Sequence, residues 1–214
     1  MAPKYGSLSD DDDDGDKAPP PYLAAGLLYL CVILCGIYAD GLARPSPSTS
    51  LLFKSSIMAD LAMCGSDACL AVILARVLGT STTAVIAAAL RLLQTAVYAS
   101  AGILALVAAM IVPNSADLCL RLHASAYQVA LVFFGLSCVL NGLLMLRRHT
   151  HPPRPFGALF VLAGVGYVLD SLGLLFLPVY DGSLSPIFMT PALVAELGLC
   201  IWLLWVALRR PDPV

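Results

Sequence analysis

Ionisable and hydrogen-bonding side chains interrupt long apolar stretches of this sequence. Such a group is costly inside a helix that crosses a lipid bilayer, so it is by default a candidate for function. The residues of this kind are Asp60, Asp67, Arg91, Gln94, His123, Tyr127, Tyr167, Asp170 and Glu196. Glu196 is the only glutamate in the chain.

Several of these residues are expected at one depth, in the outer half of the membrane, when each helix is counted at about 1.5 Å per residue. This candidate polar layer consists of Asp60, His123, Tyr127, Tyr167, Asp170 and Glu196. Three neighbouring carboxylates cannot all ionise cheaply in a medium of low dielectric constant. Shared protons, an imidazolium at His123 or a bound cation would relieve their repulsion. The pattern therefore predicts a polar binding site.

A second cluster is expected nearer the inner side, where two apolar segments form an antiparallel hairpin. Asp67 precedes the connecting loop by about as many residues as separate Arg91 from it, so both reach a similar depth. The spacing predicts an Asp67–Arg91 ion pair, with Gln94 one turn further along the helix. This pair could simply lock two helices together, or Arg91 could extend to the interface.

Each member of the polar layer also has a purely structural explanation. His123 alone is typical of an interfacial histidine, and Asp170 with Ser171 could form an interhelical hydrogen bond. Glu196 is harder to explain in this way because its segment is otherwise apolar. We expect it to face a polar interior cavity.

These residues must be positioned by six apolar segments. Each approaches or exceeds the roughly 20 residues that a helix needs to cross a bilayer. The segments cover residues 22–39, 55–78, 85–112, 124–146, 156–177 and 188–208. A backbone in lipid must satisfy its own hydrogen bonds, which favours helices. The expected fold is all-α, an integral membrane bundle of six transmembrane helices.

The composition agrees with a membrane protein. Apolar residues make up 59% of the chain and charged residues 12%, against about 25% charged in soluble domains. Six of the 14 acids lie in the first 16 residues, so we expect residues 1–21 to be a disordered acidic cytoplasmic tail. This tail is either simply solvated or, alternatively, binds cations or has a regulatory role. Residues 22–208 form the membrane domain and 209–214 a short tail. Of seven cysteines, only Cys119 is expected in a loop.

The lysines and arginines predict the orientation, since they collect on the cytoplasmic side. With both termini inside, eight lie on that side, namely Lys4, Lys17, Arg76, Arg147, Arg148, Arg154, Arg209 and Arg210. The outer side has three, Arg44, Lys54 and Arg121. We therefore expect both termini in the cytoplasm. An apolar first segment could also be a signal peptide, but the residues before it are acidic where a signal peptide is basic.

Short motifs along the chain resemble a family that has no assigned function. They are AGLLYL from Ala25, GIYAD from Gly36, ALR from Ala89 with Gln94, LH at Leu122, AY at Ala126, FFGL from Phe133, LAGVGY from Leu162, DS at Asp170, Pro191, Glu196 and WLL from Trp202. Together they are similar to domain-of-unknown-function family 4386, mostly bacterial multi-pass membrane proteins. The loop at 149–154 and Asp40, where glutamate is common, depart from the family pattern. The resemblance implies a multi-pass membrane fold and a location in the bacterial inner membrane. It implies no activity.

Three classes of function stay open from the sequence. The leading hypothesis is a polar intramembrane site that binds or moves a small solute or protons. The second is a structural or accessory membrane protein whose polar groups only hold helices together. The third, a membrane enzyme or redox subunit using His123, has no catalytic motif to support it. We expect the lipid bilayer as partner, no cofactor, no metal and no nucleic acid, and homo-oligomerisation is left open.

Overall fold

The computed structural model describes residues 21–79, 81–147 and 152–209. The acidic tail expected at 1–21 lies almost wholly outside the described residues, and so do residues 210–214 of the short C-terminal tail. Within the described residues the chain is helical and contains no strand. Six helical stretches are long and apolar enough to cross a membrane. The expected all-α membrane bundle is confirmed.

The six stretches follow one another in simple up-and-down order. They are α1 (Tyr22–Gly36) continued by the π-helix η1 (Ile37–Ala43), α2 (Leu51–Val77), α3 (Thr82–Val97) continued by the π-helix η2 (Tyr98–Ile103) and α4 (Leu104–Ile111), α5 (Ala116–Arg147), α6 (Arg154–Phe176) and α7 (Ser185–Arg209). A short 3₁₀ turn, η3 (Pro113–Ser115), joins α4 to α5. We call the end of the bundle that contains Tyr22, Val77 and Arg209 the terminal end, and the opposite end the distal end.

Polar caps extend the helices beyond the apolar segments. The Ser50 hydroxyl accepts a hydrogen bond from the Phe53 amide at 3.0 Å and so starts α2, and Ser81 caps α3 in the same way. Because α5 already begins at Ala116, Cys119 is a buried helix residue and the prediction that it lies in a loop was wrong. The proline turn just before Ala116 starts helix α5, and the distribution of apolar residues alone did not show that the helix begins there.

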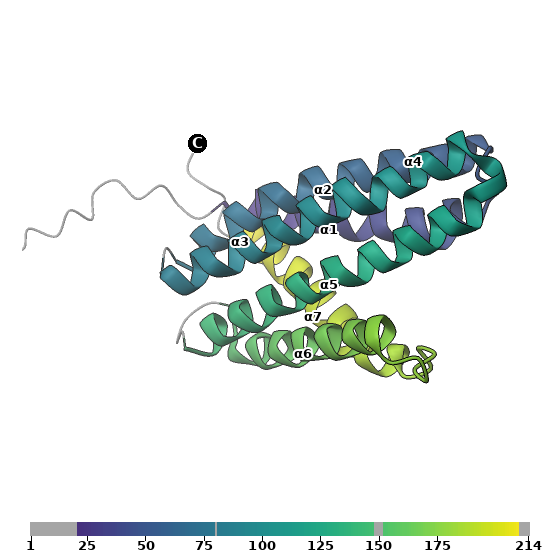
Figure 1. Cartoon of the computed structure of the whole chain (residues 1–214). Helices are drawn as coiled ribbons and strands as arrows, with labels where there is room; N and C mark the ends of the chain where they lie inside the picture. The colour runs from purple at the N-terminus through teal and green to yellow at the C-terminus, as the bar shows by residue number, and fades with distance from the viewer. Residues whose placement is uncertain (1–20, 80, 148–151, 210–214) are drawn as a thin grey trace, which may run out of the picture.

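Two groups of helices diverge toward the distal end (Figure 1). Helices α1 to α4 form one group, and α6 packs against α5 on the other side. Helix α7 runs beside α6 at the distal end and crosses to α1 at the terminal end, where Cys200 Sγ lies 3.6 Å from the Gly26 carbonyl oxygen. The contact between α1 and α7 is thus tight at the terminal end, and the helix groups separate beyond it.

Glycines allow the close packing of α5 on α6. A Cβ atom on Gly142 would lie 2.6 Å from the Gly157 carbonyl oxygen, and one on Gly135 would lie 2.7 Å from that of Gly164. No side chain fits at such distances, so small residues permit the helix backbones to approach each other. This contact fixes the position of α6, which carries part of the polar site.

The burial pattern is the reverse of that in a water-soluble protein. Large apolar side chains cover the outside, as at Leu27, Leu34 and Ile201, which are more than half exposed. Charged side chains are instead buried, and Asp60, Arg91 and Asp170 are among them. An apolar exterior, with the charged side chains buried among an otherwise apolar interior, suits a lipid environment. The chain is therefore a multi-pass membrane protein.

Candidate functional site

A cavity of about 240 Å³ lies between the two diverging groups. Helices α1, α2, α3, α5, α6 and α7 all contribute to its wall. Its polar lining consists of Asp40, Asp67, Gln94, Tyr127, Tyr167 and Glu196. All of these residues except Asp40 belong to the polar layer or the inner cluster predicted from the sequence, and the cavity brings members of both sets together.

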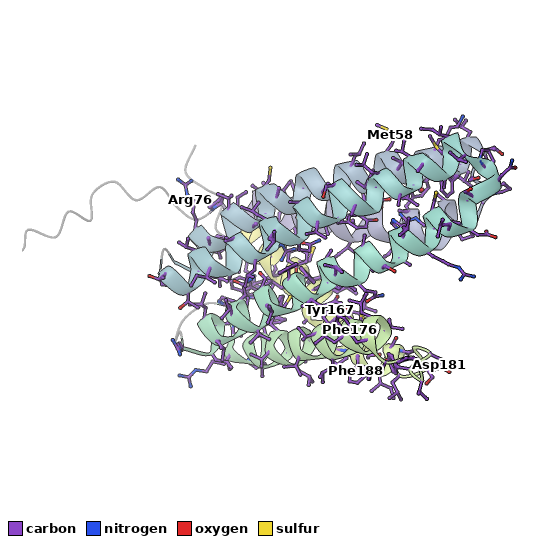
Figure 2. All side chains as sticks on the ribbon, viewed as in Figure 1. Met58, Arg76, Tyr167, Phe176, Asp181 and Phe188 are labelled. Atoms are coloured by element: carbon purple, nitrogen blue, oxygen red, sulfur yellow. The ribbon has the colours of Figure 1, made fainter. Side chains whose placement is uncertain are left out.

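Glu196 occupies the α7 side of this cavity. The Tyr167 hydroxyl donates a hydrogen bond to Glu196 Oε1 at 2.7 Å, and the Tyr167 ring stands edge-on to Phe134 with 5.2 Å between ring centres. Figure 2 shows Tyr167 between α5 and α6, away from the loop that carries Asp181. A second, more open cavity of about 390 Å³ between α6 and α7 also reaches Tyr167, Leu193 and Glu196. The carboxyl group is therefore reached from two sides.

Asp67 and Arg91 form a buried ion pair on the opposite wall. Arg91 Nε and Nη2 donate to Asp67 Oδ1 at 2.8 and 2.6 Å. Thr95 donates to Asp67 Oδ2 at 3.0 Å, and the Gln94 amide, with its nitrogen turned toward the carboxylate, donates to the same oxygen at 2.9 Å. Both carboxylate oxygens are occupied, so the negative charge of Asp67 is compensated within the protein.

Aromatic rings surround the Arg91 guanidinium. Its carbon lies 5.4 Å from the centre of the Tyr29 ring and 4.9 Å from that of Phe134, distances that permit cation–π attraction. Arg91 Nη1 has no hydrogen-bond partner among the described residues. Phe134 thus lies between the Arg91 ion pair and Tyr167, and it separates the two polar walls of the cavity.

Arg44 connects two carboxylates at the distal end. Its guanidinium contacts Asp40, and its Nη2 lies 2.5 Å from Oδ2 of the buried Asp60. The π-helix η1 extends the first helix beyond residue 39, so that Asp40 and Arg44 lie four residues apart on continuous helical backbone. From the sequence we used Arg44 only as one of the three cations expected on the outer side. The four-residue spacing from Asp40 was the signal that could have revealed its role.

His123 belongs to the same distal region, on α5. Its Nδ1 lies 3.0 Å from the carbonyl oxygen of Gly102 in η2. Its ring centre is 5.7 Å from that of Tyr98, which in turn lies 5.6 Å from the ring of Tyr127. π-Helical turns break the regular hydrogen-bond register and are frequent at functional sites. Here His123 engages the irregular backbone and does not line the cavity.

Asp170 has a separate environment of its own. It accepts hydrogen bonds from the Tyr180 hydroxyl and, at 2.6 Å, from Ser185 Oγ. The hydrogen bond to Asp170 raises the pKa of the Tyr180 phenol, which lies in the loop before α7. Asp170 is buried but does not line either cavity. The structure thus divides the expected carboxylate layer into three parts, at Asp60, Asp170 and Glu196.

Comparisons with known proteins place the chain in a family and go no further. No curated protein and no solved structure matches it. The model of one family, described as a domain of unknown function, matches residues 24–207, which span all six membrane helices. The match covers most of the chain and agrees with the resemblance seen in its motifs. The chain belongs to the family of the domain of unknown function DUF4386.

Proposed function

We propose that this protein binds a small solute inside the membrane, in the cavity between its two groups of helices. The observation that carries the proposal is the position of Glu196. Its carboxyl group lies on the cavity wall, it is reached from two cavities, and its hydrogen-bond donor is the Tyr167 hydroxyl at 2.7 Å. A cavity with apolar walls and a few convergent polar groups is the usual form of a small-molecule site.

Access from two sides also supports movement of the solute. Glu196 and Tyr167 lie where the cavity of about 240 Å³ meets the more open one between α6 and α7. A solute that exchanges between these spaces would pass the same carboxyl group. Binding is the first step of any such movement, and it is the step that we test.

The test measures thermal unfolding of the full chain in detergent with a panel of cationic, anionic and neutral small solutes. A solute present at about 100 times its Kd stabilises the folded protein by about 2.7 kcal/mol. We expect at least one solute to raise the Tm of the parent protein, and Leu193→Trp, which enlarges a side chain that lines both cavities, to abolish that shift. Asp170→Asn changes a buried carboxylate outside the cavity, so the shift should survive in this control.

Two results would overturn the proposal. One is a panel in which no solute stabilises the parent protein. The other is a Tm shift that Leu193→Trp leaves unchanged, because the solute would then bind elsewhere.

A helix-locking role is the second candidate, and the Asp67–Arg91 pair favours it. This pair joins α2 to α3 through two charged hydrogen bonds that are satisfied within the protein. If the polar residues serve only this purpose, Glu196→Gln should lower the Tm without altering any solute-dependent shift. Loss of the shift with little change in the Tm of the solute-free protein instead supports the binding role.

We also propose that the terminal end of the bundle faces the cytoplasm of a bacterial cell. Among the described residues, four arginines and no acids lie near this end: Arg76, Arg147, Arg154 and Arg209. Arg76 extends outward there (Figure 2). A C-terminal fusion to a fluorescent protein that folds only in the cytoplasm should be bright, and a dark fusion together with an active periplasmic reporter would reverse the orientation.

A further inference from the structure

The charges around the cavity differ in whether the protein itself compensates them. Three acids line the cavity: Asp40, Asp67 and Glu196. Asp40 contacts Arg44, and Asp67 is paired with Arg91. Glu196 forms no ion pair with any described residue, and its hydrogen bond comes from the neutral Tyr167 hydroxyl. Glu196 is thus the cavity acid that has no cationic partner among the described residues.

We propose that the solute is a monovalent protonated amine with a compact apolar body, and that Glu196 is its counterion. The inference rests on the proposed function and specifies its ligand. A carboxylate removed from water is stabilised by a close cation and by hydrogen bonds to its remaining lone pairs. An ammonium group supplies both, since it carries one positive charge, three donors and no acceptor.

The hydrogen-bonding groups beside Glu196 fit an ammonium group. Tyr167 uses its proton on Glu196, so its oxygen can accept. Tyr127 also lines the cavity, and a phenol oxygen can accept a hydrogen bond as well. An anionic solute would instead meet the Glu196 carboxylate, while Arg91 Nε and Nη2 are engaged by Asp67. Arg91 Nη1 is free of hydrogen bonds to the described residues, but Arg91 lines neither cavity. The arrangement selects against anions.

The walls favour an aromatic or short aliphatic body. The rings of Tyr127, Phe134 and Tyr167 line the cavity together with Leu131 and Leu193. Aromatic faces attract cations and apolar groups alike. At about 240 Å³ the cavity lies slightly below the range of about 300–1,000 Å³ for typical ligand sites, which indicates a small ligand. Glu196 is the one cavity acid without a cationic contact among the described residues, so it matches one positive charge, and the second charge of a diamine would meet only acids that Arg44 and Arg91 already contact.

The experiment compares three probes that share an apolar body and differ in charge: phenylbutylamine, phenylbutanol and phenylbutyrate. Binding to the full chain in lipid nanodiscs is measured by calorimetry at neutral pH, with empty nanodiscs as the blank for partition into lipid. We expect the amine to bind the parent protein at least about tenfold more tightly than the alcohol or the acid, a difference of about 1.4 kcal/mol.

Variants separate charge from shape. Glu196→Gln keeps the size of the side chain and should weaken amine binding at least about tenfold, while alcohol binding changes by less than about threefold. Asp170→Asn removes a carboxylate outside the cavity and should change none of the three affinities. Leu193→Trp should abolish binding of every probe.

The outcomes distinguish the amine inference from the proposed function. If the alcohol or acid binds the parent as tightly as the amine, or if Glu196→Gln leaves the amine unaffected, the amine inference is refuted while cavity binding stands. The amine inference is likewise refuted if no probe binds although another solute gives a Tm shift that Leu193→Trp abolishes. If no probe or panel solute binds in a way that Leu193→Trp abolishes, the proposed function itself fails.

Discussion

Removing either charge of the Asp67–Arg91 pair should destabilise the protein strongly, whereas removing both should restore much of the loss. Arg91 is 1% exposed and donates twice to Asp67 Oδ1, at 2.8 and 2.6 Å. Truncating one partner of such a pair leaves an uncompensated buried charge and costs about 3–5 kcal/mol. We therefore expect losses of this size for Asp67→Asn and for Arg91→Gln.

The double variant tests the cause of these losses. With both changes present, an amide faces an amide and no charge is left without a partner. The large loss in each single variant comes from the charge that is left without a partner, and the double variant has no such charge, so we expect it to be more stable than either single variant. With single losses of at least about 3 kcal/mol and a smaller loss in the double variant, the coupling energy in the double-mutant cycle should be at least about 3 kcal/mol, at or above the upper end of the range for directly contacting residues.

The assay is reversible unfolding in mixed micelles at neutral pH, with the free energy of unfolding taken from denaturant titration of all four proteins. Double-mutant cycles on polar pairs in membrane proteins give coupling energies that average only about 0.6 kcal/mol, because the side chains also find hydrogen-bond partners in the unfolded state. This ion pair should exceed that average, since its partners are buried charges. If each single change costs under about 1 kcal/mol, or if the two losses simply add, our account of the pair is wrong.

Three further predictions concern helix packing, helix capping and the pH dependence of stability. Gly142→Ala should lower the free energy of unfolding by about 1–3 kcal/mol, because its Cβ would lie 2.6 Å from the Gly157 carbonyl oxygen. Gly65→Ala is the control: its Cβ would have nothing within 4 Å, so it should be neutral or slightly stabilising in the same denaturant titration. Ser50→Ala removes the α2 cap and should cost about 1 kcal/mol of unfolding free energy. The pKa of the Tyr180 phenol is raised in the folded state, so the protonated phenol stabilises the protein at neutral pH, and this stabilisation is lost as the pH rises above about 10. Tyr180→Phe should remove this part of the pH dependence, which is measured as the Tm against pH.

The sequence was sufficient to predict the helices and one of the contacts. A helix pair joined by a short loop is antiparallel, so counting residues from the loop places Asp67 and Arg91 at matching depth, and the two side chains meet. Apolar length alone located six spans, because a membrane imposes that length. Both inferences need only distance along the helix axis.

The composition of the site could not be predicted in the same way. Asp170 and Glu196 were expected at one depth, yet Asp170 is engaged by Tyr180 and Ser185 while Glu196 faces the cavity. Depth does not specify the direction in which a side chain points around its helix, and that direction depends on which helices are neighbours. Arg44 was missed for a different reason, since its position depends on the π-helix η1, which apolar patterning does not predict.

The pairing of charges also indicates which parts of the bundle can move against each other. The ion pairs whose two partners are both described lie within the first three spans, Arg44 with Asp40 and Asp60, and Arg91 with Asp67. Glu196 and Tyr167 instead belong to α6 and α7 and bond to each other. Opening or closing the cavity by a rotation about the tight α1–α7 contact at the terminal end would therefore preserve these bonds, and it would be taken up where α5 contacts α3 and η2, at the Ser137–Ala87 and His123–Gly102 hydrogen bonds. The α1–α7 contact includes the packing of Gly26 against Leu204, where a Cβ on Gly26 would lie 2.6 Å from the leucine side chain. Neither residue lines the cavity, so a larger residue at Gly26 should alter solute binding only by changing how α1 and α7 pack.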